Sequence, residues 1–329
     1  MINRRTLLAA AAGTLPLAAC DEGTRKTIRE RMNPTGVGGA GPAAGPAGSG
    51  PAAATATGQG AISTTVRTPA RPWTFDVFRE AMAASGRNPT ISEAQFADIQ
   101  SRKSGAMARI KAYLEGKFGS ADPAVLAAFE SVPRDYFHYA YAAGASTAYQ
   151  AYEDNPKPWA IGHGSVLSDY LGQAYMSQLA APKPGDVTLE IGTGSGFQSS
   201  LLSRIVRDAY TIEIIQPVGE AVGKIFAPLG YDNVHSRVGD GYFGWPEVEG
   251  GFDTIMLTCV AQYAPPELFR QLKPGGKLII PIGQPFRRGQ VLYVYTRDEQ
   301  GRVHSRRDVG VFFIPMTGAM QNRARPQGG

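Results

Sequence analysis

The chain has 329 residues, of which 43% are hydrophobic and 19% are charged, and its formal net charge is +5. This length allows one sizeable buried core with appendages. The two cysteines, Cys20 and Cys259, exclude a framework of several disulfides. The sequence has no long Lys/Arg run and no basic stripe interleaved with aromatic residues, so we expect no nucleic-acid partner.

The first 20 residues have the features of an export signal. Arg4 and Arg5 form a basic start, an apolar Ala/Leu-rich stretch follows, and Leu17-Ala-Ala-Cys20 ends it. This ending resembles a bacterial lipobox, in which Cys20 carries the lipid, and the arginine pair resembles a twin-arginine signal. We therefore predict a signal peptide over residues 1–20 and an exported, membrane-anchored lipoprotein facing the periplasm. The alternative is a cytoplasmic protein with an Ala-rich start.

The next part of the chain changes composition twice. Residues 33–68 are dominated by Gly, Ala, Pro, Ser and Thr, and such a stretch buries too little surface to offset its ordering entropy. We predict a flexible linker over residues 21–73. Apolar residues then recur at helical spacing, which predicts a helical N-terminal region over residues 74–130. The main domain is expected over residues 131–320, followed by a disordered tail over 321–329.

A strand, a glycine loop and a helix follow one another from Val187 onward. The β-rich run Val187–Ile191 leads into Gly192-Thr-Gly-Ser-Gly196, and helical spacing resumes after it. Glycines let the backbone approach a ligand closely, and the helix N-terminus adds the positive end of a dipole. The G-x-G-x-G spacing differs from the G-x-G-x-x-G of dinucleotide-binding domains. Glu190 would repel a pyrophosphate but suits an ammonium group, which favours S-adenosylmethionine over a nicotinamide cofactor.

Further strands alternate with helices, and polar residues stand at their ends. The second strand ends at Glu213, where a carboxylate can accept both ribose hydroxyls. The third ends at Gly239-Asp-Gly241, where Asp240 can accept from an adenine amino group. The fourth ends at Thr258. A fifth strand follows, and then two β-rich segments, 290–297 and 306–314, with no helix between them, which predicts an antiparallel hairpin.

This alternation predicts an α/β fold with a doubly wound, mostly parallel sheet. It is the Rossmann-like fold of class I methyltransferases, here with N-terminal helices and a terminal antiparallel hairpin. Ligands of such sheets bind at the carboxyl ends of the strands. The predicted donor-binding residues share that edge, and they are Glu190, Gly192, Thr193, Gly194, Ser195, Gly196, Glu213, Gly239, Asp240, Gly241 and Thr258. No metal is expected in this site.

Residues from about 125 to 318 resemble the protein-L-isoaspartate O-methyltransferases. The most specific matching stretches are Val132-Pro-Arg-Asp-Tyr-Phe137 and Leu229-Gly-Tyr-Asp-Asn-Val234, and the segment Phe313-Ile-Pro-Met316 also matches. The resemblance implies a methyltransferase that uses S-adenosylmethionine, acts on L-isoaspartyl carboxylates of damaged proteins, and so serves protein repair. A carboxylate acceptor is already ionised at neutral pH, so catalysis needs alignment and exclusion of water rather than a strong base.

The expected acceptor loop departs from the family pattern. The family usually has Gln-Thr-Ile-Ser-Gln-Pro, whereas this chain has Ser-Val-Leu-Ser-Asp-Tyr over residues 165–170. Ser168 aligns with the family's functional serine and is the predicted catalytic residue. Asp169 places a carboxylate where it would repel a carboxylate acceptor, and His163, where the family often has an aromatic residue, is assigned a structural role. The remaining members of the predicted substrate loop are Ser165, Val166 and Leu167.

Two alternatives to isoaspartyl methylation stay open. One is a methyltransferase with a different acceptor, and the other is a degenerate, membrane-tethered binding protein without turnover. Asp169 and the export signal favour the second, because S-adenosylmethionine is made in the cytoplasm, whereas the intact donor motifs oppose it. A further alternative, a nicotinamide dehydrogenase, is disfavoured by the spacing of the glycine loop.

Overall fold

The computed structural model describes residues 66–322. The predicted signal peptide, Cys20, the linker as far as residue 65 and the tail from residue 323 lie outside the described residues. No helix of residues 66–322 is long and apolar enough to cross a membrane. The predicted division of the chain into domains stays a prediction.

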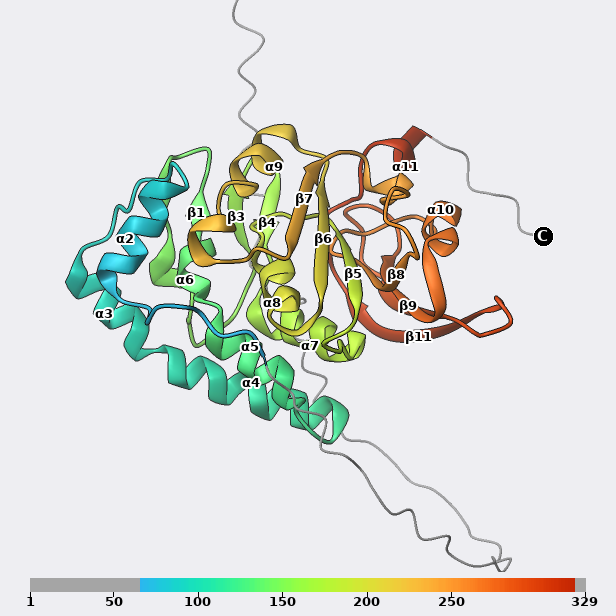
Figure 1. Cartoon of the computed structure of the whole chain (residues 1–329), viewed down its shortest axis with the longest axis horizontal. Helices are drawn as coiled ribbons and strands as arrows, with labels where there is room; N and C mark the ends of the chain where they lie inside the picture. The colour runs from blue at the N-terminus through green and yellow to red at the C-terminus, as the bar shows by residue number, and fades with distance from the viewer. Residues whose placement is uncertain (1–65, 323–329) are drawn as a thin grey trace, which may run out of the picture. The chain divides into compact units, whose positions relative to one another are not determined.

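The N-terminal part is helical, as its apolar spacing predicts, and three of its helices begin at a side-chain cap. The Thr74 hydroxyl accepts from a backbone amide of the first turn, Ser92 and Gln95 form a capping box, and Asp122 accepts from two amides. These helices gather on one side of the molecule (Figure 1). They are α2 (Phe75–Ala84), α3 (Glu93–Ser101), α4 (Lys103–Phe118), α5 (Pro123–Ser131) and α6 (Arg134–Phe137).

The centre of the molecule is a seven-stranded sheet with the order β11-β10-β9-β8-β5-β6-β7. The pairs among β5 to β9 are parallel, whereas β10 pairs antiparallel with both β9 and β11. The mostly parallel sheet and its terminal antiparallel hairpin confirm the predicted fold class. The strands are β5 (Val187–Ile191), β6 (Asp208–Glu213), β7 (Val234–Val238), β8 (Phe252–Leu257), β9 (Leu272–Ile282), β10 (Gln290–Arg297) and β11 (Val303–Val311).

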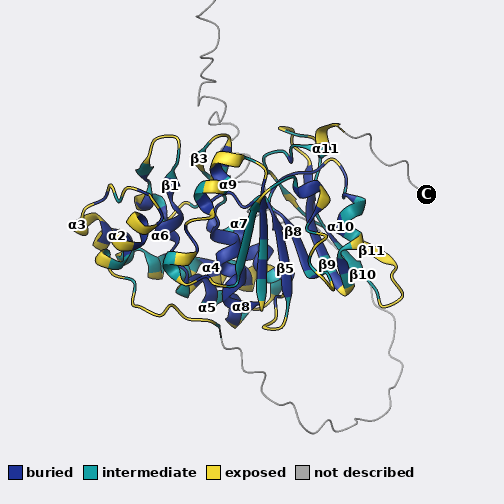
Figure 2. Cartoon of the chain, turned by 45° about the horizontal axis from the view of Figure 1, so that its top comes forward, coloured by how far each residue is buried: buried dark blue, intermediate teal, exposed yellow. Residues whose placement is uncertain are grey.

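Apolar side chains fill both faces of the sheet, because successive residues of a strand point to opposite faces. In β8, Ile255 and Leu257 belong to one hydrophobic cluster, whereas Met256 belongs to another together with residues of α7. The central strands β5 and β8 are therefore mostly buried, whereas the edge strand β7 is only partly buried and the other edge strand, β11, has mostly exposed residues (Figure 2). The remaining helices are α7 (Tyr170–Ala180), α8 (Phe197–Ile205), α9 (Gln216–Val222), α10 (Pro266–Arg270) and α11 (Ala319–Asn322), with short 3-10 turns η2 (Ala148–Gln150), η3 (Ala227–Leu229) and η4 (Gly241–Phe243).

Two short hairpins stand apart from the large sheet. Strands β1 (Tyr139–Ala140) and β2 (Ala145–Ser146) form the first, and β3 (Trp159–Gly162) and β4 (Ser165–Leu167) form the second. The turn of the second is Gly162-His163-Gly164, in which all three residues have positive φ. This hairpin carries the predicted substrate loop, so the loop is an ordered β-hairpin joined directly to α7.

The segment that enters the domain is fastened to the end of α8. The Arg67 amide donates to the Arg204 carbonyl at 2.8 Å, and the Arg67 Nη1 donates to the carbonyls of Ser203 at 3.1 Å and Val206 at 2.9 Å. The last carbonyls of a helix lack partners within it, and a cation there also suits the helix dipole. Arg67 therefore caps the carboxyl end of α8, the end remote from the glycine loop.

Candidate functional site

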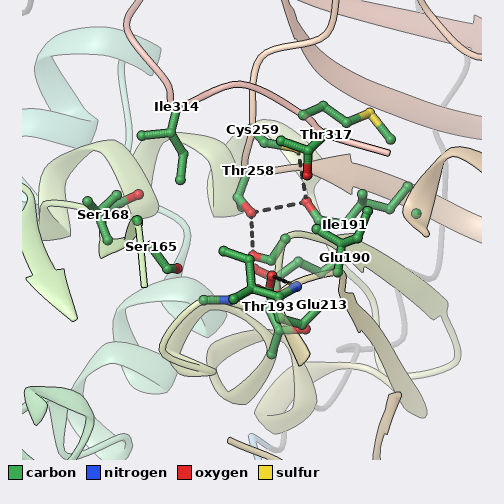
Figure 3. Close-up of a pocket in the computed structure, with 18 of the residues that line it drawn as sticks. Ser165, Ser168, Glu190, Ile191, Thr193, Glu213, Thr258, Cys259, Ile314 and Thr317 are labelled. Carbon is green, nitrogen blue, oxygen red and sulfur yellow. Dashed lines mark hydrogen bonds between the residues drawn. The ribbon is translucent and has the colours of Figure 1, made fainter. Parts of the chain in front are cut away.

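A cavity of about 470 Å³ lies at the carboxyl ends of β5, β6 and β8, where the fold predicts a ligand (Figure 3). Figure 3 shows Ser165 and Ser168 on one side of it and Glu190 on the other. Most of the predicted residues line this cavity: Ser165, Val166, Ser168, Glu190, Gly192, Thr193, Gly194, Ser195, Glu213, Gly241 and Thr258. The structure thus brings the two predicted groups, donor residues and substrate loop, to one cavity.

The glycine loop adopts a shape that only glycine fits at two of its positions. Gly192 has φ 101°, and a Cβ there would lie 2.7 Å from the Thr258 Oγ1. Gly196 has φ 81°, and a Cβ there would lie 2.9 Å from the Val222 Cγ1. The Thr258 hydroxyl donates to the Gly192 carbonyl at 2.6 Å. Thr258 therefore fastens the loop, and its hydroxyl hydrogen is directed at the protein rather than at a ligand.

Glu213 braces the loop from the other side. Its Oε2 accepts from the Gly194 amide at 2.8 Å, and its Oε1 accepts from the Ile215 amide at 3.0 Å. Burial raises the pKa of this carboxyl, and the two amides oppose that shift. A carboxylate has about four acceptor positions, so both oxygens keep capacity for hydroxyls of a ligand. This arrangement suits the ribose contact that the sequence predicts.

Glu190 is a second buried acid on the cavity wall, with 1% of its surface exposed. It accepts from the Thr211 hydroxyl at 3.0 Å. Burial, with the neighbouring Glu213 adding to it, raises the pKa of Glu190 to about 8. A cation entering the cavity would favour the ionised form and lower this pKa. The site is therefore suited to a ligand that carries a positive charge.

The structure corrects the placement of two residues of the predicted substrate loop. Asp169 does not line the cavity; it is the N-cap of α7, it is 4% exposed, and its Oδ1 accepts from the Gly172 amide at 2.8 Å. Leu167 points into the hydrophobic core on the opposite face of β4 from Val166. Asp169 therefore caps a helix and lies outside the cavity lining, and the expected repulsion between its carboxylate and a carboxylate acceptor stays a prediction.

Three predicted donor residues also lie outside the cavity lining. The carboxylate of Asp240 accepts from the Tyr242 amide at 2.9 Å and from the Ala319 amide at 2.7 Å. Asp240 thus caps η4 and holds the start of α11, and its predicted adenine contact stays a prediction, because a carboxylate that accepts from two amides keeps further acceptor positions. The Gly239 amide donates to the Glu213 carbonyl at the end of β6 at 2.9 Å, and Gly196, the last glycine of the loop, faces Val222 and Phe226.

Sequence reasoning missed the wall formed by the segment after β11. Ile314, Pro315, Met316 and Thr317 line the cavity, and hydrogen bonds with Val260 hold this segment: the Val260 amide donates to the Ile314 carbonyl and the Met316 amide to the Val260 carbonyl, both at 2.8 Å. The family-like stretch 313–316 was the available signal. The mouth also carries Phe286, which is 72% exposed and has φ 56°.

Two further missed residues are Gln173 of α7 and Cys259, which also line the cavity. Burial, with Glu213 and Glu190 nearby, raises the pKa of the Cys259 thiol, so this cysteine stays protonated and is no nucleophile at neutral pH. Among residues 66–322 no group of three or more His, Cys, Asp or Glu residues could hold a metal ion.

These residues fit S-adenosylmethionine. The volume lies in the range of small-molecule sites, the two buried acids suit an ammonium group and a ribose, and the glycine loop allows close backbone approach. Fold and site together define a class I methyltransferase that uses S-adenosylmethionine.

The family model described as protein-L-isoaspartate(D-aspartate) O-methyltransferase matches residues 111–321. The chain belongs to this family.

Several relatives and solved structures agree with this assignment. The chain is 44% identical over 203 residues to protein-L-isoaspartate O-methyltransferase 1 of Nitrosospira multiformis, covering 61% of this chain and 82% of that protein. It is 41% identical over 217 residues to the corresponding protein 1 of Cupriavidus necator, covering 66% and 80%. A solved protein-L-isoaspartate O-methyltransferase matches with TM-score 0.55 and 25% identity, covering 66% of this chain and 67% of that chain.

A Plasmodium falciparum protein, crystallised in complex with S-adenosyl-L-homocysteine, shares the fold. The match has TM-score 0.51 and 22% identity, and it covers 64% of this chain and 97% of that chain. Residues 66–110, with α2, α3 and the start of α4, precede the part that the family model matches.

Proposed function

We propose that this protein transfers a methyl group from S-adenosylmethionine to the carboxylate of L-isoaspartyl residues in damaged proteins. The observation that supports the proposal most directly is that one cavity has donor-binding residues on one side and acceptor-loop residues on the other. The glycine loop, braced by Glu213, forms the wall for the donor, and the β3–β4 hairpin faces it with Ser165 and Ser168. Membership of the family supports the isoaspartyl acceptor.

The residues of the cavity have separate tasks in this reaction. When bound, S-adenosylmethionine supplies an electrophilic methyl group. Glu213 accepts hydrogen bonds from ribose hydroxyls, and Glu190 accepts the ammonium group. Ser168 donates its hydroxyl hydrogen to the acceptor carboxylate and so fixes the attacking oxygen. No residue needs to remove a proton, because the acceptor is ionised at neutral pH. Catalysis comes from alignment of the reactants in a cavity that limits access of water.

A matched pair of peptides tests the acceptor. The full chain is given S-adenosylmethionine and either an isoaspartyl peptide or the same peptide with a normal aspartyl residue, and the methyl ester is measured. We expect ester only with the isoaspartyl peptide. Binding of S-adenosylhomocysteine without ester formation on either peptide would refute this acceptor and favour a methyltransferase of another substrate. Absence of both binding and turnover would refute the methyl-transfer function itself.

We also propose that the protein is an exported lipoprotein, with Cys20 as the lipidated residue. The basic start, the apolar stretch and Leu17-Ala-Ala-Cys20 support this location. The test compares the wild type with Cys20→Ala in a bacterial host after separation of membrane, periplasmic and cytoplasmic fractions. We expect the wild type in the membrane fraction and the variant outside it. Finding both proteins in the cytoplasm would contradict the proposal and support the alternative location.

A further inference from the structure

The loop between β9 and β10 holds a phenylalanine in a conformation that suits glycine. The Arg287 amide donates to the Gln284 carbonyl at 3.3 Å, which closes a turn with Pro285 and Phe286 at its centre. Phe286 has φ 56°, and the residue after a proline in such a turn is commonly glycine, because a bulky side chain there is strained. Backbone strain of this kind is concentrated at functional sites. The turn therefore marks its aromatic ring as a candidate for function.

The ring of Phe286 lies at the mouth of the cavity and is open to solvent. At 72% exposure it is the most exposed of the large apolar side chains within the described part of the chain, and it lines the cavity together with Ile214. Three non-glycine residues among those described have positive φ, and two of them, His163 and Phe286, line this cavity. An exposed apolar group gains free energy when a partner covers it. A peptide acceptor extends to both sides of its reacting residue, so it must cross this rim.

The base of the loop is fastened to another wall of the cavity. The Gln290 side chain is fully buried, and it accepts from the Phe313 amide at 2.6 Å and donates to the Phe313 carbonyl at 3.1 Å. At the start of the loop, a Cβ on Gly283 would lie 2.8 Å from the Gln290 Cα, so the two ends of the loop pack closely. Residues 314–317 line the cavity directly after Phe313. The loop is therefore held in place beside the segment that forms this wall.

The loop carries positive charge that no nearby part of the sequence balances. Arg287 and Arg288 are both exposed and directly follow the phenylalanine. The sequence has no Asp or Glu over residues 268–297, which contain the loop, or over 309–318, which contain the segment fastened to it. Within the described part of the chain Arg287 belongs to no ion pair. An exposed guanidinium in such surroundings attracts a carboxylate and suits its two oxygens.

We propose that the turn 284–287 selects isoaspartyl sites that have an acidic residue beside the damaged one. Phe286 packs against the acceptor chain where that chain leaves the cavity, and Arg287 pairs with the flanking Asp or Glu side chain. The inference rests on the proposed methyl-transfer function, which supplies a peptide acceptor, and it adds the class of site that the protein prefers. Both residues determine specificity, and neither takes part in methyl transfer.

Paired isoaspartyl peptides test the charge. One pair has Glu or Gln directly before the damaged residue, a second pair has Glu or Gln directly after it, and kcat/KM is measured for the full chain. We expect the wild type to use the Glu peptide of at least one pair about threefold to fivefold better than its Gln twin, with a smaller ratio at high salt. Arg287→Gln should lower kcat/KM for that Glu peptide to the value of its twin. Arg307→Gln is the matched control, because it removes the same charge from an exposed side chain of β11 outside the cavity lining.

Phe286→Gly tests the ring and separates its role from folding. Glycine relieves the positive φ, so the midpoint of thermal denaturation should stay the same or rise. The KM of every isoaspartyl peptide should nevertheless rise about tenfold, because the variant has no ring to cover. Phe286→Leu keeps an apolar side chain and should give a KM between those of the wild type and the glycine variant. Calorimetry with S-adenosylhomocysteine should show a change of less than twofold in either variant.

Three results would overturn the inference while the methyl-transfer function stands. One is equal use of the Glu and Gln peptides by the wild type at low salt. Another is a ratio that Arg287→Gln leaves unchanged, or that Arg307→Gln lowers as much, since net charge would then explain it. The last is weaker binding of S-adenosylhomocysteine by Phe286→Gly with an unchanged peptide KM, which would assign the ring to the donor. A wild type that binds S-adenosylhomocysteine but methylates none of the peptides refutes the proposed acceptor, and the inference falls with it.

Discussion

The two walls of the cavity are built in different ways. The donor wall consists mainly of one stretch, residues 190–215, whose loop is held by short bonds from Glu213 and Thr258 to its own backbone. The acceptor wall joins the β3–β4 hairpin, the start of α7 and the segment 314–317, which are far apart in the sequence. The donor wall is thus preformed by bonds within one stretch and a single bond from Thr258, whereas the acceptor wall depends on contacts that several distant segments make with one another.

The largest effect is expected from Glu213→Ala, which removes the brace of the donor wall. The variant loses the acceptor for ribose hydroxyls and leaves the Gly194 and Ile215 amides without their partner. We expect S-adenosylhomocysteine to bind about 100-fold more weakly, about 2.7 kcal/mol in binding free energy. Calorimetry measures this, with the exposed acid variant Asp232→Ala as control. An unchanged affinity would mean that the donor wall does not depend on this carboxylate.

The second prediction concerns pH and Glu190. Because burial holds its pKa near 8, Glu190 is mostly protonated at pH 7, and a ligand ammonium must displace that proton. We expect the affinity for S-adenosylhomocysteine to rise between pH 6.5 and 8.5, with proton release seen by calorimetry in buffers of different ionisation enthalpy. Glu190→Gln should release no proton and bind about tenfold more weakly at pH 8.5.

The same group affects folding with a definite sign. A carboxyl whose pKa is raised in the folded state adds stability below its unfolded pKa, and that stability is lost as the pH rises through about 8. Glu190→Gln should therefore unfold at higher denaturant concentration than the wild type at pH 8.5. Equal proton release by wild type and variant, or equal stability at that pH, would exclude Glu190 as the group responsible.

The third prediction tests the acceptor wall through Asp169→Gln. The longer side chain cannot cap α7 as Asp169 does, and the buried charge of Arg134 loses a nearby anion. We expect a loss of about 0.5–2 kcal/mol in the free energy of unfolding. Turnover should fall about fivefold, because Ser168 directly precedes the cap, whereas donor affinity stays within twofold. Asp169→Asn retains a capping oxygen and is the control. Higher turnover in Asp169→Gln would support the prediction that Asp169 repels the acceptor.

The smallest effect is expected from Asp240→Ala, which loosens the other half of the acceptor wall. Asp240 holds the Ala319 amide just after the lining segment, so its loss should raise the KM of an acceptor peptide about threefold. Affinity for S-adenosylhomocysteine should change less than twofold, because Asp240 does not line the cavity. A strong loss of donor affinity with an unchanged KM would mean that Asp240 contacts the donor. It would also mean that Asp240 does not support the acceptor wall.

The donor wall could be predicted from sequence because its parts are local. A strand, glycines at fixed spacing and an acid at the end of the next strand need only the rule that parallel strands end at one edge. The capping roles of Asp169 and Asp240 could not be predicted, for one shared reason. An aspartate at the end of a strand or loop can bind a ligand, or it can cap the next helical turn. The sequence alone does not distinguish these two roles. Here both acids cap.

Gln173 and the segment 314–317 could not be found in this way. Gln173 stands within the buried face of a helix, where a single polar residue gives no spacing signal, and its hydrogen-bond partner Arg134 lies 39 positions away. The segment 314–317 reaches the cavity through its bonds to Val260. Such features follow from tertiary contacts, which the spacing of residues in one sequence does not contain.

The cap that Arg67 places on α8 has a mechanical consequence. Helix α8 starts at the glycine loop and runs nine residues, about 13 Å, to the end that Arg67 holds. A pulling force on the segment that contains Arg67 therefore acts at the end of α8, one helix length from the glycine loop. The opening of the cavity does not lie at this point of attachment. The glycine loop is therefore mechanically separated from the point where the leading segment attaches to the domain.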